Sequence, residues 1–130
     1  MKRIEGRKLG VWSLRLDAIY CTLLGGTVAL GAAPIAAVVA IPQPLITAAG
    51  IAVVLWAGLV LWMLMRLRIQ TALRMVMGVN ILAALLVAVC AVAAGTLLTV
   101  VAVLAVAVDI AIFAGSQALA LRTLPTVQTA

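Results

Sequence analysis

The sequence has no histidine, and acidic residues are scarce: Glu5, Asp17 and Asp109 are the only three among 130 residues. Without an imidazole, the usual nucleophile–base pairs and histidine-containing metal sites cannot form. The three carboxyl groups are also too widely spaced along the chain to form a pair for acid–base catalysis. We therefore expect a protein that is not an enzyme and holds no metal and no cofactor.

Cysteine is nearly as rare, with Cys21 and Cys90 the only two. They fall in different apolar stretches, at depths that differ by about 14 Å if both stretches are helical. A disulfide needs Cα atoms within about 7 Å of each other. We therefore expect both thiols to be free and to act as small packing side chains.

Apolar residues, in contrast, make up 68% of the chain, and charged residues only 9%. A soluble domain could not bury so much apolar surface, so the expected solvent is a lipid bilayer. A spanning helix needs about 20 residues, and the chain has such stretches at about 13–33, 45–65, 72–94 and 97–121. The sequence thus predicts an all-α fold, an up-down bundle of four transmembrane helices within residues 13–122. A basic, partly flexible arm at 1–12 precedes it, and a disordered tail at 123–130 follows.

The basic residues all fall on one side of this four-span arrangement: Lys2, Arg3, Arg7, Lys8, Arg15, Arg66, Arg68, Arg74 and Arg122. The two connections on the other side carry no charge. The positive-inside rule makes the basic side cytoplasmic and places both termini there, in a cell membrane. The net charge of +6 therefore indicates topology and not nucleic-acid binding, and it is compatible with attraction to anionic lipid headgroups.

Asp109 lies near the middle of the fourth apolar stretch, where an ionisable side chain is energetically unfavourable. Helical rise places it about 20 Å from the inner interface, and Thr27 and Trp56 reach a similar depth as possible hydrogen-bond partners. One interpretation is a proton-binding or cation-binding carboxyl that faces a cavity. The other is a protonated carboxyl that bonds Thr27, Trp56 or a neighbouring subunit and stabilises helix contacts by about 0.6–2 kcal/mol.

Other polar residues extend this feature. Ser116 and Gln117 lie on the same helical face as Asp109, at spacings of seven and eight residues. With residues of similar depth from other spans, they form a candidate polar column of Asp109, Asn80, Gln117, Ser116, Asp17 and Tyr20. Asp17 is the shallowest, about 6 Å deep by helical rise, and is expected at the membrane interface near Arg15. A wet column would favour transport or ligand binding, and a dry one would favour a structural role.

Small residues recur on the first two spans and predict close helix contacts. In the first span they repeat every four positions, and in the second they form two short clusters. The predicted helix-packing residues are Gly25, Ala29, Gly50 and Gly58.

Three short segments carry a resemblance: Leu14 to Ala18 opens the first span, Gly78 to Leu82 lies in the third, and Gly115 to Arg122 closes the fourth. In these segments the chain resembles a broad group of small four-span bacterial membrane proteins of unknown function, common in actinobacteria. Members often carry an aromatic residue shortly after the asparagine, where this chain has Ile81 and Leu82. The resemblance implies a fold and a location, and no activity.

Chain size and span number are also similar to those of the small multidrug-resistance exporters, which use an acidic residue in the first span and work as dimers. Here the first-span acid is Asp17, and the deep acid is Asp109 in the fourth. The leading hypothesis is an accessory subunit, or a bundle that binds lipid or a small molecule. Its expected partners are the lipid bilayer, other membrane proteins or a second copy, and not nucleic acid. The alternative is a small proton-coupled exporter that uses Asp109.

Overall fold

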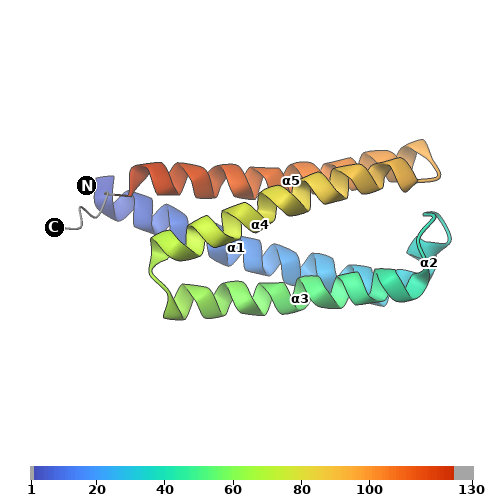
Figure 1. Cartoon of the computed structure of the whole chain (residues 1–130), viewed down its shortest axis with the longest axis horizontal. Coiled ribbons are helices and arrows are strands. Elements are labelled where there is room, and N and C mark those ends of the chain that lie inside the picture. Colours follow the sequence, from blue (N-terminus) through green and yellow to red (C-terminus); the bar gives the residue numbers. More distant parts are fainter. Residues whose placement is uncertain (1, 125–130) are drawn as a thin grey trace.

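The computed structural model describes residues 2–124, and within that range the chain is helical apart from short connections (Figure 1). The elements in order are α1 (Lys2–Leu30), α2 (Ala32–Ala36), α3 (Gln43–Arg66), α4 (Ile69–Cys90), the 3₁₀ turn η1 (Ala91–Ala93) and α5 (Leu97–Thr123). The predicted all-α class is confirmed.

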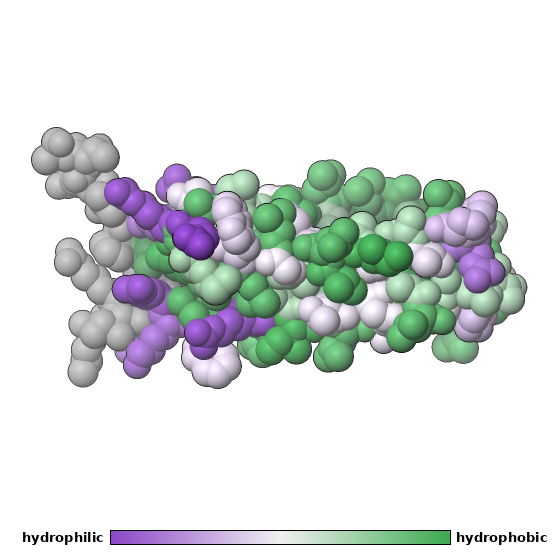
Figure 2. Space-filling model, turned by 90° about the horizontal axis from the view of Figure 1, so that it is seen from below, coloured by the Kyte–Doolittle hydropathy of each residue, from purple (hydrophilic) through white to green (hydrophobic). Residues whose placement is uncertain are grey.

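Three of these helices, α3, α4 and α5, are long and apolar enough to cross a membrane. The hydrophobic surface of the molecule forms a band between two more hydrophilic ends, and charged side chains gather at the end where α1 begins and α5 ends (Figure 2). Apolar side chains point outward along this band, among them Leu55, Leu85 and Ile112. The chain is therefore a helical membrane protein.

The first helix begins earlier than the sequence predicts. Residues 2–12, predicted as a partly flexible arm, belong to α1. Two glycines there sit against other helices: a Cβ atom on Gly6 would lie 2.6 Å from Thr123 Oγ1, and one on Gly10 would lie 2.9 Å from Leu73 Cδ1. Because the arm packs on the ends of α4 and α5, it is part of the bundle. The predicted disordered tail lies outside the described residues beyond Leu124.

The helices associate as two pairs. α1 packs mainly on α3, α4 packs mainly on α5, and α1 joins the pairs by packing on α5. Although only Leu67 and Arg68 connect α3 to α4, these two helices diverge from their link and contact each other little (Figure 1). The buried core therefore lies around α1 in the charged half, with Leu14, Leu73 and Met63 at its centre.

The contact between α1 and α3 rests on small residues. A Cβ atom on Gly25 would lie 2.6 Å from the Gly50 carbonyl oxygen, and one on Gly50 would lie 2.5 Å from the Ala29 nitrogen. Backbone atoms therefore meet directly at this crossing, as the pattern of small residues predicts. Gly58 differs from the prediction, because a Cβ atom there would meet nothing within 4 Å. It faces away from the bundle and is not a packing residue.

At the uncharged end, the two connections touch each other. Val39 and Ala94 form an isolated antiparallel bridge, and the Gly95 amide donates to the Val38 carbonyl at 3.3 Å. Thr96 caps α5 by a reciprocal exchange with Thr99, which satisfies amides that the first helical turn leaves free. These contacts hold the outer ends of the two helix pairs together.

Candidate functional site

Asp17 of α1 is the centre of a buried polar cluster, with only 2% of its surface exposed. Its Oδ2 atom accepts hydrogen bonds from Asn80 Nδ2 at 2.6 Å and from Gln117 Nε2 at 2.8 Å. Asn80 Nδ2 also lies 3.3 Å from Gln117 Oε1 as a donor, and the Cys21 thiol donates to Asp17 Oδ1 at 3.4 Å. We call Asp17, Cys21, Asn80 and Gln117 the Asp17 seam.

The Asp17 seam is sealed and satisfied. Asn80 and Gln117 are 3% and 0% exposed. Among the described residues, no buried side-chain nitrogen or oxygen lacks a hydrogen-bond partner. A fully satisfied polar cluster fixes the helices that contribute to it, since an unpaired buried polar group is unfavourable. The seam therefore ties α1 to α4 and α5, and it has the character of a dry structural contact.

The position of Asp17 corrects the sequence prediction, which placed it at the membrane interface beside Arg15. Arg15 is exposed, whereas Asp17 is buried two positions later. Counting residues along a helix gives height only, and the side to which a residue points depends on which neighbours pack there. Because α1 continues to Lys2 and packs on α5 below Asp17, the carboxyl is enclosed by protein.

A second polar contact lies nearer the charged end. Ser13 Oγ and Ser116 Oγ are 2.6 Å apart, and Ser116 Oγ also donates to the Phe113 carbonyl at 2.8 Å. Since Ser116 uses its hydrogen on that carbonyl, Ser13 is the donor between the two hydroxyls. Ser116, predicted as part of the polar column, thus joins α5 to α1 at this level.

Asp109 has a different environment, because it is exposed on the outer surface of the bundle. Tyr20 Oη donates to Asp109 Oδ2 at 3.1 Å. The Tyr20 ring also meets the Phe113 ring, with centroids 5.4 Å apart and planes inclined by 51°. Together with Ile112, these residues border an open pocket of about 210 Å³. We call Tyr20, Asp109, Ile112 and Phe113 the Asp109 face.

The partner of Asp109 also differs from the prediction, which named Thr27 and Trp56. The Thr27 hydroxyl donates to the Leu23 carbonyl of its own helix at 2.7 Å, and Trp56 packs against the apolar core from α3. Equal depth did not bring these residues together, because α5 lies beside α1 and presents Asp109 to a tyrosine nearer the charged end. The long phenol side chain spans the remaining height.

The predicted polar column is therefore divided into three contacts between α5 and α1 or α4. The sequence analysis missed Ser13 as a member and treated Cys21 as a packing residue only. Ser13, Asp17 and Cys21 are spaced by four residues, which places them on one helical face. That spacing was the available signal that this face of α1 turns toward the bundle.

The arrangement offers no evident catalytic group. Among the described residues, no three histidine, cysteine, aspartate or glutamate side chains gather as a metal site. What remains is one sealed carboxyl inside the bundle and one accessible carboxyl outside it. Comparison with protein families, characterised proteins and solved structures finds no match to this chain.

Proposed function

We propose that this protein is a non-enzymatic accessory subunit of the cell membrane that binds another membrane protein, or a second copy of itself, through the Asp109 face. In this proposal α1 also crosses the bilayer, giving four spans with both termini in the cytoplasm. The Asp17 seam and the glycine contact with α3 support the fourth span, because they bind α1 along α3, α4 and α5. The grouping of basic residues at one end supports the orientation.

The observation that carries the proposal is the exposure of Asp109 on an otherwise apolar helix. Lipid chains cannot hydrogen-bond a carboxyl, and a charged side chain at the centre of a membrane helix costs about 2.5–3.5 kcal/mol on insertion scales. Tyr20 supplies a single hydrogen bond to one oxygen. A protein surface with polar side chains would cover the carboxyl and supply the remaining hydrogen bonds.

Photo-crosslinking in native membranes tests this proposal. A photoreactive amino acid replaces Ile112, which is 62% exposed on the Asp109 face, and in a matched control it replaces Leu55, which is 69% exposed on α3. We expect position 112 to give a defined protein adduct and position 55 to react with lipid. Only lipid adducts at position 112, or the same protein adducts at both positions, would contradict the proposal.

A second candidate function is proton-coupled transport. The pocket on the Asp109 face favours it, because a carboxylate beside two aromatic rings is suited to bind a proton or an organic cation. In proteoliposomes, this function predicts a proton-dependent flux that Asp109→Asn abolishes. A flux that survives Asp109→Asn, or no flux with any of a panel of organic cations, would exclude transport through this residue.

A further inference from the structure

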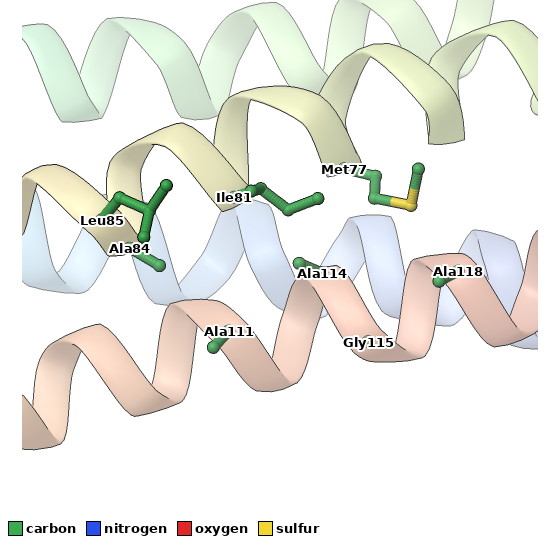
Figure 3. A pocket seen from close by; sticks show the side chains of 8 residues that line it. All are labelled: Met77, Ile81, Ala84, Leu85, Ala111, Ala114, Gly115 and Ala118. Carbon is green, nitrogen blue, oxygen red and sulfur yellow. The ribbon is translucent and has the colours of Figure 1, made fainter.

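A second feature of the surface is a groove between α4 and α5 that holds about 370 Å³ and shares no residue with the Asp109 face. Met77, Ile81 and Leu85 line it from α4, and Ala114, Gly115 and Ala118 line it from α5 (Figure 3). The longer side chains of α4 form one wall, while α5 contributes only methyl groups and backbone.

The groove is open and apolar. Ile81 is 48% exposed and Leu85 is 61% exposed. At Gly115 a Cβ atom would meet nothing within 4 Å, so the space above this residue is free. Residues 111 to 118 extend along α5 by about 10 Å, which gives the groove an elongated shape along the membrane normal. This shape suits a hydrocarbon chain.

Two arginines flank the end of the groove nearest the charged end of the molecule. Arg74 precedes Met77 by three positions, and Arg122 follows Ala118 by four, spacings that keep each arginine on the groove face of its helix. Both side chains are exposed. Since α4 begins and α5 ends at the same end of the bundle, the two guanidinium groups lie at the same membrane level (Figure 1).

We infer that this groove binds an anionic phospholipid, with one acyl chain along Ile81 and Gly115 and the phosphate held by Arg74 and Arg122. The guanidinium group matches phosphate in shape and charge, and the apolar groove continues inward from the two arginines. An apolar partner helix would fill the groove but would leave both arginines without an anion. This inference goes beyond the proposed function and uses different residues.

Native mass spectrometry of the detergent-purified protein, titrated with phosphatidylglycerol or phosphatidylcholine, tests the inference. We expect one phosphatidylglycerol to bind in preference to phosphatidylcholine. Replacing both Arg74 and Arg122 by glutamine should weaken that binding about 30-fold, from the usual attraction of two basic residues at a membrane surface. Arg66→Gln with Arg68→Gln is the matched control, because it removes two charges at the same end outside the groove.

A second variant tests the groove without changing charge. Gly115→Leu projects a side chain into the free space and should weaken phosphatidylglycerol binding about tenfold, as expected if it displaces two methylene groups. Gly58→Leu is its control, since Gly58 is equally unobstructed on α3. Equal binding of the two lipids, or full phosphatidylglycerol binding by Gly115→Leu and the arginine variant, would overturn the inference. So would a bound polypeptide in place of lipid.

Discussion

At the scale of single residues, the protein separates its two membrane-embedded carboxyl groups. Asp17 is enclosed and accepts hydrogen bonds from three neutral donors, whereas Asp109 is exposed and has a tyrosine partner. The first environment fits a structural role, and the second leaves hydrogen-bonding capacity for another molecule. The difference comes from the direction in which each side chain points, not from its chemistry.

Replacing Asp17 by alanine should destabilise the fold by about 1–3 kcal/mol, because Asn80 and Gln117 would lose a buried acceptor. Asp109→Ala is the matched control and should change the free energy of unfolding by less than about 0.5 kcal/mol. Unfolding of the purified protein in mixed micelles, followed by circular dichroism, measures both values. Equal stability of the two variants would show that the Asp17 seam does not hold the bundle together.

The sequence predicted which residues form the site better than it predicted their relations. It identified Asp17, Asn80 and Gln117 as residues of similar depth, and the structure joins them. It gave priority to Asp109 and placed Asp17 at the interface, because depth along a helix follows from the sequence while burial depends on the neighbouring helices. The contact of Asp109 with Tyr20 could not be predicted without the crossing of α1 and α5.

At the scale of helices, the crossing of α1 and α3 depends on the absence of side chains. The Cβ atom of Gly50→Ala would collide with backbone atoms of Ala29 and Gly25, which cannot move without separating the helices. We expect this variant to lose about 1–3 kcal/mol of stability by overpacking. The same unfolding measurement checks it.

Gly58→Ala is the control for this prediction, since both changes replace glycine by alanine within α3. With nothing within 4 Å of the new methyl group, it should be neutral or should stabilise the helix by about 0.5–1 kcal/mol. A Gly50→Ala variant as stable as Gly58→Ala would mean that the two helices do not pack as closely as the structure shows.

Helix existence followed from the sequence, but helix pairing did not. The apolar stretches predicted α3, α4 and α5 with ends close to those observed. A short link suggested that α3 and α4 are neighbours, yet α3 packs chiefly on α1. The small residues of α1 and α3 allow their backbones to approach, and this gain in contact outweighs proximity along the chain.

At the scale of the whole molecule, the four-span proposal predicts which positions face the cell exterior. In a Cys90→Ala background, single cysteines replace Arg7, Arg68 or Thr96, and a membrane-impermeant maleimide is applied to intact cells. We expect labelling of Thr96→Cys alone, because Arg7 and Arg68 lie at the charged, cytoplasmic end. Labelling of Arg7→Cys together with Thr96→Cys would show that α1 does not cross the bilayer.

The most direct test of the central claim is the mass of the assembly extracted in mild detergent, measured by native mass spectrometry. The single chain has a mass of 13.4 kDa. We predict that the wild-type protein leaves the membrane with a second polypeptide and that Asp109→Ala leaves as a folded single chain. A wild-type protein extracted only as a 13.4 kDa monomer, or an Asp109→Ala variant that keeps its partner, would contradict the claim that the Asp109 face is a protein interface.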